Sequence, residues 1–420
     1  MVKELRFLRL ISSDAVGVVN NQMMMIAIPA AALLILNFSP SQASVLLIAE
    51  WLPSVLFATL VGSSVDRFDR TRILICANTL CSFSAIAIAL IIVTKPPYIL
   101  FLIVLLCFIN ACGNLIQNIC ATAALPNSLI SLEVKKAIGL QSSTKTIAQI
   151  LGQGLAGLLA GFGGIVSPIY FMIASGLAKF LLFLTPIEKK SCLTTYSHSS
   201  ITTGSLVFDK DVLKPQSELQ FDWQEVLKIR NVKLILLLIF SINMTGSIAE
   251  GAFFSYIYKT LLLTPMQVSI MFVAGGMSGV IAALSTGRLV DRFSHVKVSS
   301  IAAVGCSLSL WLIPFASIKY SFVTMIFYDV VFTYLVTTFG VSTAMFRQII
   351  VPNFMLGRLT SFFIRVSSVA VIAGLSTSTI LLNYFSPLQV LLFSCSLALF
   401  SVLLVLITFR YCTNFASSTL

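Results

Sequence analysis

Long apolar segments recur along the whole chain, and this pattern constrains its fold more than any other feature. A helix that crosses the hydrocarbon core of a bilayer needs about 20 predominantly apolar residues. We expect twelve membrane-spanning helices, near residues 11–36, 43–65, 73–94, 98–124, 138–163, 166–187, 232–258, 266–288, 298–317, 320–345, 362–384 and 388–410. With 58% apolar and only 10% charged residues, the chain carries too little charge to cover the surface of a soluble protein. We therefore predict an all-α integral membrane protein.

One polar stretch near the middle of the chain divides these segments into six and six. Residues 188–231 are rich in Ser, Thr and charged side chains, a composition typical of a flexible linker. We predict an N-terminal six-helix bundle at 1–187, a cytoplasmic linker at 188–231 and a C-terminal six-helix bundle at 232–420.

The positive charges indicate the orientation in the membrane. Of the 27 Lys and Arg residues, 23 fall on the side that holds both termini and the linker, while the opposite loops hold only Lys95, Lys259 and Lys319. Cytoplasmic loops carry an excess of Lys and Arg, so we expect both termini in the cytoplasm and the chain in a plasma membrane of the bacterial inner-membrane type. This clustering accounts for the net charge of +12 without a nucleic-acid partner, and we expect a monomer surrounded by membrane lipids.

An eleven-residue segment occurs twice, after the second expected helix of each half. Residues 62–72 read GSSVDRFDRTR and residues 287–297 read GRLVDRFSHVK, with five identical positions and a cation at the end of both. Matching segments at corresponding places indicate a duplicated six-helix unit, as in transporters that are built from repeats.

Both copies resemble the G-x-x-x-D-R-x-x-R/K signature of the major facilitator superfamily, which lies between its second and third helices and recurs between the eighth and ninth. The length, the 6+6 arrangement and the central loop agree with this resemblance, so it covers nearly the whole chain. It implies two pseudo-symmetric six-helix bundles that rock around a central site. It also implies a gating role for the signature residues, which are Gly62, Asp66, Arg67, Arg72, Gly287, Asp291, Arg292 and Lys297.

The residue types of the signature suit a gate for physical reasons. Glycine lets a neighbouring helix approach closely. A carboxylate at a helix end can accept hydrogen bonds from the first amides of the adjoining helix, and the cations can pair with carboxylates or lipid phosphates. The alternative is that the cations only determine the topology.

Two further stretches, Leu125–Gly152 and Gly357–Arg365, resemble the bacterial exporter branch that includes macrolide and siderophore exporters. The chain also departs from the antiporters of the superfamily. They often carry a G-P-x-x-G-G segment on the fifth helix, whereas Gly152–Gly157 lacks the proline. They usually place an Arg in the fourth helix, but none lies between Arg72 and Arg230.

Three carboxyl groups, Glu50, Glu250 and Asp329, lie well inside apolar segments, whereas Asp14 is close to the cytoplasmic end of the first segment. A charge inside a membrane helix costs at least about 2.5–3.5 kcal/mol and usually faces a wet cavity. Because a carboxyl group in apolar surroundings favours its neutral form, we expect these residues to carry protons or to bind substrate. An acidic set favours protons and cationic or zwitterionic substrates over anions. The alternative is that each carboxyl is hydrogen-bonded within the bundle.

Uncharged amides are the second group of candidate site residues. Spacings of four, three and four residues put the fourth-helix amides on one helical face. The candidates are Asn21 and Gln22 in the first expected helix, Asn110, Asn114, Gln117 and Asn118 in the fourth, and Gln149 and Gln153 in the fifth. Such amides either line a cavity and hydrogen-bond a polar substrate or join one helix to another.

No pattern for a nucleotide-phosphate loop, a metal site, a cofactor or a catalytic triad is present, so we predict a transporter and not an enzyme. The expected function is proton-coupled export of a small amphiphilic or polar molecule, of the drug or siderophore type, by alternating access. An importer or a lysophospholipid flippase of the same fold is one alternative. A receptor-like membrane protein that transports nothing is the other.

Overall fold

The computed structural model describes residues 2–67, 70–124, 131–164, 167–168, 170–171, 173–174, 230–316, 320–350 and 353–417. These residues form α-helices joined by short connections. The helices are α1 (Val2–Leu34), α2 (Pro40–Arg67), α3 (Arg70–Thr94), α4 (Ile99–Ala124), α5 (Ser131–Gly163), α8 (Arg230–Ser255), α9 (Pro265–Phe293), α10 (His295–Ser309), α11 (Ser321–Ile350), α12 (Asn353–Leu381) and α13 (Pro387–Ser417). A π-helical turn, Tyr256–Thr260, continues α8. Most of the expected sixth helix, 166–187, and of the linker, 188–231, lies outside the described residues.

Ten segments of the described helices are long and apolar enough to cross a membrane, which makes the chain a multi-pass membrane protein. Eleven of the twelve expected spans correspond to a described helix. The helices extend beyond the predicted spans at several ends, most clearly in α1, which begins at Val2, and in α12, which begins at Asn353. The apolar windows mark only the part within hydrocarbon, whereas the backbone hydrogen bonds of a helix continue through flanking polar residues.

Three helices begin with the same local sequence, Ser/Thr-Pro-x-Gln, at Ser39, Thr264 and Ser386. At Thr264 the side chain accepts from the Gln267 amide at 3.3 Å, and Gln267 Oε1 accepts from the Thr264 amide at 2.8 Å. Equivalent pairs of bonds form at Ser39 and at Ser386. The proline needs no hydrogen-bond acceptor at the first helical position, so the motif fixes the start of α2, α9 and α13.

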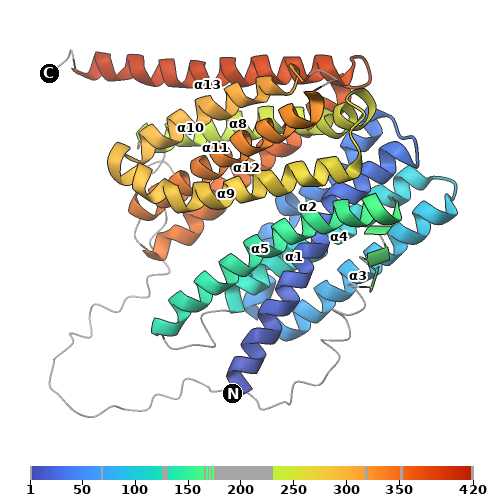
Figure 1. The fold of residues 1–420 in the computed structure, drawn as a ribbon. Coiled ribbons are helices and arrows are strands. Elements are labelled where there is room, and N and C mark those ends of the chain that lie inside the picture. Colours follow the sequence, from blue (N-terminus) through green and yellow to red (C-terminus); the bar gives the residue numbers. More distant parts are fainter. Residues whose placement is uncertain are drawn as a thin grey trace, which may run out of the picture.

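The described helices form two groups, α1–α5 and α8–α13 (Figure 1). Within the first group, α4 packs on α2 and α3, and α1 packs on α5. Within the second, α8 packs on α12 and α13, and α11 packs on α9 and α10. The groups meet where α5 contacts α9 and where α2 contacts α8 and α12. In Figure 1 they converge at one end of the molecule and spread apart toward the other.

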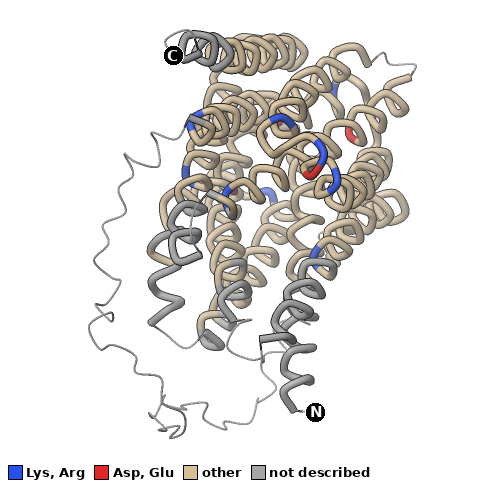
Figure 2. Tube along the Cα trace, turned by 90° about the vertical axis from the view of Figure 1, so that its left-hand side faces the viewer, with Lys and Arg blue, Asp and Glu red and all other residues tan. Residues whose placement is uncertain are grey.

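Charged residues are sparse on these helices, and Figure 2 shows them as isolated bands on otherwise uncharged tubes. Apolar side chains fill each group and also pack between the two groups. One core lies around Met23 and Ile88 in the first group, and another around Ile235 and Phe363 in the second. A third, around Phe253 and Tyr328, lies beside the surface that the second group turns toward the first.

Candidate functional site

A cavity of about 890 Å³ lies between the two groups of helices. Residues of α1, α2 and α5 form one wall, and residues of α8, α9, α11 and α12 form most of the other. Its size is within the range of cavities that hold small molecules. Since both groups contribute to the lining, any movement of one group against the other changes the shape of the cavity.

Two of the three predicted carboxyl groups line this cavity, Glu250 from α8 and Asp329 from α11. Glu50, on α2, is not on the wall, but its neighbour Trp51 is. The carboxyl groups of Glu50 and Glu250 lie within electrostatic range of each other, although they belong to different groups of helices. The structure therefore brings acidic residues of both halves to the centre of the molecule.

Asp329 lies in a notch that a glycine of the neighbouring helix provides. The residue is 5% exposed. A Cβ atom on Gly275 of α9 would collide with Asp329 Oδ2 and would lie 3.1 Å from Thr333 Oγ1. Among the described residues, Oδ2 has no hydrogen-bond partner.

Amides from the first group form part of the opposite wall. Gln22 of α1 and Gln149 and Gln153 of α5 line the cavity. Gln153 Nε2 donates to Gln22 Oε1 at 3.0 Å, which joins α5 to α1. Gln153 Oε1 is buried and has no partner among the described residues.

The amides of α4 bond to the neighbouring helices α3 and α1 and, unlike Gln22 and Gln153, do not lie on the cavity wall. Asn110 Nδ2 donates to Ser84 Oγ at 2.8 Å, and Gln117 Nε2 donates to Cys81 Sγ at 3.3 Å, both on α3. Asn114 Nδ2 donates to Asn21 Oδ1 of α1 at 2.8 Å. These amides are absent from the lining of the large cavity.

In the described structure, Asn110, Asn114 and Gln117 and their partner Asn21 therefore join helices and do not line this cavity. A polar side chain in a membrane helix needs a hydrogen-bonding partner, and α3 and α1 supply it. A pocket of about 10 Å³ beside Asn21, Asn110 and Asn114 has room for little more than a water molecule. The side chain of Asn118 lies outside the described part of the chain.

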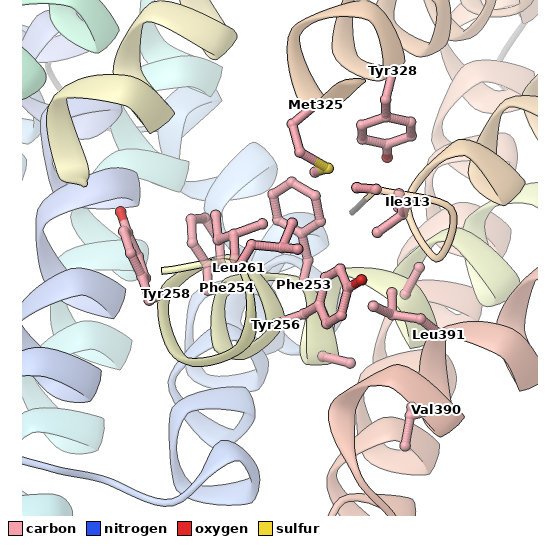
Figure 3. Close-up of a cluster of buried hydrophobic side chains, with 14 of the residues drawn as sticks. Phe253, Phe254, Tyr256, Tyr258, Leu261, Ile313, Met325, Tyr328, Val390 and Leu391 are labelled. Carbon is pink, nitrogen blue, oxygen red and sulfur yellow. The ribbon is translucent and has the colours of Figure 1, made fainter. Parts of the chain in front are cut away.

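Aromatic residues of the second group complete the cavity, and the sequence patterns had not singled them out. Figure 3 shows Phe253, Phe254 and Tyr328 gathered where α8 and α11 face each other. The ring centroids of Phe253 and Tyr328 are 6.0 Å apart, and those of Tyr328 and Phe332 are 5.5 Å apart. Phe272 of α9 lies 6.3 Å from Phe254. With 32 Phe residues in the chain, sequence position alone does not mark these few.

The first signature copy can be placed only in part. Asp66 and Arg67 are in the last turn of α2 and Arg72 is in the first turn of α3, but their side chains and the packing of Gly62 lie outside the described features.

The second signature copy is described in full. Asp291, Arg292 and Lys297 are exposed, and the Arg292 guanidinium lies 5.3 Å from the centre of the Phe293 ring. Ser294, the residue before α10, makes no side-chain capping hydrogen bond. Ser342 of α11 instead donates to the His295 carbonyl at 3.0 Å and so anchors the start of α10. Gly287 has open space, since the nearest atom to an added Cβ would be 3.9 Å away on Met345.

Direct contacts join the two groups at one end of the cavity, which we call the closed end. It contains residues 35–39 after α1 and 261–264 before α9. Lys259 Nζ donates to the Phe38 carbonyl at 2.6 Å, and Thr379 Oγ1 of α12 donates to Ser44 Oγ of α2 at 2.9 Å. Gly157 of α5 touches Ser269 of α9 so closely that a Cβ on the glycine would overlap it.

Comparisons with known proteins agree with this architecture. The sequence model of the Major Facilitator Superfamily matches residues 15–354. No curated relative matches the chain in sequence.

Several solved transporters share the fold. A bacterial homologue of the iron transporter ferroportin, in its inward-facing state, has a TM-score of 0.74 and 14% identity over 97% of this chain and 98% of that chain. The nucleoside transporter NupG has a TM-score of 0.73 and 13% identity over 96% of this chain and 99% of that chain. A D-xylose–proton symporter has a TM-score of 0.66 and 12% identity over 96% of this chain and 97% of that chain. At these identities the likeness concerns the fold alone. Because the family model covers more than half of the chain, the chain belongs to the major facilitator superfamily and is a membrane transporter.

Proposed function

We propose that this chain is a proton-coupled secondary active transporter that exports a small amphiphilic or polar molecule by alternating access. The observation that carries the proposal is the cavity between the two groups of helices, with Glu250 and Asp329 on its wall and Glu50 close by. Membrane helices keep costly carboxyl groups where they serve an ion or substrate path. The assignment to drug or siderophore export rests on the resemblance of Leu125–Gly152 and Gly357–Arg365 to that branch.

The proposed orientation places both termini in the cytoplasm of a bacterial inner membrane and the closed end outside. The excess of Lys and Arg near the termini supports it. The cavity would then open to the cytoplasm. A further support is that the ferroportin homologue gives a TM-score of 0.74 in its inward-facing state and of 0.61 in its outward-facing state. The division into bundles at 1–187 and 232–420 is part of the same proposal, as is a monomeric state.

Proton coupling follows from the placement of Glu50 and Glu250. Two carboxylates that approach each other in an apolar site repel, so the proton affinity of such a pair depends on the distance between them. The two residues belong to helices of opposite groups, α2 and α8. When the groups rock, the distance between the carboxyl groups changes, and with it the affinity of the pair for a proton. Proton release and uptake are thereby linked to the change of access.

Reconstitution into proteoliposomes tests the proposed function. Compounds that stabilise the purified protein against heat are first selected from amines, siderophores and nucleosides. With a pH-sensitive dye inside the vesicles, the wild-type protein should move protons when such a compound is added. E50Q, E250Q and D329N should each lose most of this proton movement, because an amide does not release a proton. Substrate flux that is the same with and without a pH gradient under every condition would rule out proton coupling. Binding of a compound without any flux would favour a receptor.

A further inference from the structure

We propose that the cavity binds an amphiphilic organic cation, with its positive centre beside Glu250 and its apolar body on the aromatic wall of α8, α9 and α11. This inference rests on the proposed transport function and specifies the substrate class for the same cavity. It combines three features of the described wall: the sign of its charges, its aromatic surface and the kind of polar atoms that lack partners.

The charges on the wall are all of one sign. Glu250 and Asp329 line the cavity, whereas none of the residues that line it in the described part of the chain is Lys, Arg or His. Lys145 adjoins the lining residue Thr146 but is not on the wall. Lys259 is engaged with the Phe38 carbonyl at the closed end. An anion in this cavity would face carboxylates in a low-dielectric region without a compensating cation, which is a large electrostatic cost.

Aromatic rings cover the same part of the wall as the carboxyl groups. The aromatic wall consists of Phe253 and Phe254 of α8, Phe272 of α9, and Tyr328 and Phe332 of α11, and Trp51 of α2 lies across the cavity. The rings contact one another at centroid distances of 5.5–6.4 Å, so they form one continuous surface. The face of an aromatic ring attracts a cation and packs against apolar groups. Such a surface suits a positive centre that is surrounded by carbon.

Glu250 and Asp329 have different positions within this wall. Asp329 is 5% exposed, and its Oδ2 faces the notch at Gly275. Glu250 is only partly buried. It precedes Phe253 and Phe254 by three and four residues, about one turn of α8, and so lies on the same side of the helix. Glu250 is therefore the more accessible carboxylate for a bound molecule, and Asp329 adds negative potential from the notch at Gly275.

Two buried polar atoms of the lining residues lack a partner in the described structure, and both are acceptors. Asp329 Oδ2 and Gln153 Oε1 are both buried without a hydrogen-bond partner among the described residues. Acceptors favour a positively charged or donor-bearing ligand over one that is rich in acceptors. A sugar-like molecule needs many donor–acceptor pairs around it, whereas most of this lining is apolar. A cation with a carbon-rich body fits these conditions better than a neutral polyol.

A matched pair of probes separates charge from shape. Tetraphenylphosphonium and tetraphenylborate have nearly the same size and apolar surface but opposite charge. Equilibrium dialysis of the labelled ions against purified, detergent-solubilised protein measures saturable binding, and detergent without protein measures partition into micelles. We expect saturable binding of tetraphenylphosphonium and none of tetraphenylborate. Saturable binding of both ions with similar affinity, or of neither, would overturn the inference.

Substitutions locate the bound cation. E250Q should weaken tetraphenylphosphonium binding at least about tenfold, and E250D should retain most of the affinity because it keeps the charge. F253L should weaken binding severalfold through loss of a ring face. F327L is the matched control, because Phe327 is on the same helix as Tyr328 but is 57% exposed and away from the cavity. Monodisperse elution on size exclusion confirms that each variant is folded. Equal affinity of wild type and a folded E250Q protein would contradict the assignment of Glu250.

Transport measurements distinguish this inference from the proposed function. If the protein binds tetraphenylphosphonium through Glu250 but moves no compound in proteoliposomes, the substrate class stands and the transport function fails. If it moves an anionic or neutral compound with protons and does not bind the cation, the transport function stands and the inference fails.

Discussion

Asp329 owes its position to Gly275, because the glycine leaves the space that the carboxyl group occupies. In the described structure this is a contact between one side chain of α11 and the backbone of α9, and a methyl group at residue 275 would overlap Asp329 Oδ2. Inserting atoms into a well-packed region forces side chains or backbone to move. Substitutions at these two residues therefore test how tightly α9 and α11 pack at the notch.

G275A should lower the stability of the purified protein by about 1–3 kcal/mol, seen as a lower midpoint of thermal unfolding. In the D329A background the same G275A substitution should lower the stability less, since the added methyl group then occupies space that the carboxyl has left. G340A is the matched control, because no atom lies within 4 Å of an added Cβ at Gly340. If G275A and G340A have the same effect, the notch is not as tight as described.

At the scale of single helices, amides of the same chemistry have two different roles. The amide face of α4 joins α3 and α1 through Asn110 and Asn114, whereas Gln149 of α5 is exposed on the cavity wall. A hydrogen bond between membrane helices contributes about 0.6–2 kcal/mol. The role of each amide therefore depends on which neighbour its helix face meets.

N110A should destabilise the protein by about 0.6–2 kcal/mol and leave substrate affinity unchanged, because it removes the bond to Ser84 far from the cavity. Q149A should have the opposite effect, a weaker substrate affinity with little change in stability. Thermal unfolding and binding measurements on both variants check this. A loss of affinity in N110A that exceeds the one in Q149A would mean that the α4 stripe, and not α5, contacts the substrate.

On the scale of the whole molecule, direct hydrogen bonds hold the two groups of helices together at the closed end. The Thr379–Ser44 hydrogen bond of 2.9 Å and the Lys259–Phe38 hydrogen bond of 2.6 Å each join helices or loops of opposite groups. A transporter that alternates its access has to break such contacts in every cycle.

The double variant S44C/T379C should form a disulfide under mild oxidation, since the hydroxyl oxygens that it replaces are 2.9 Å apart. The bond should fix the closed end and abolish transport, and a reducing agent should restore it. Flux in proteoliposomes before and after reduction measures the effect. The single variants S44C and T379C are controls for the other cysteines of the chain. Undiminished flux in the fully cross-linked protein would show that the closed end does not open during transport.

The sequence by itself determined the membrane class, the approximate position of eleven described helices and the position of the acidic residues along them. These properties depend only on neighbouring residues. About 20 consecutive apolar residues are enough to span the hydrocarbon core, and a carboxyl group is rare among them because it is costly there. The repeat at 62–72 and 287–297 likewise identified the family, which the family model confirmed.

Only the tertiary structure decided which faces of these helices meet a cavity. Lipid and protein interior are about equally apolar, so a helix face that turns toward lipid, a neighbour or a substrate has much the same composition. For this reason the α4 amides were indistinguishable from lining residues until their partners on α3 and α1 were known. The notch at Gly275 and the ring cluster around Phe253 arise from helices far apart in sequence, and only their packing brings them to one wall.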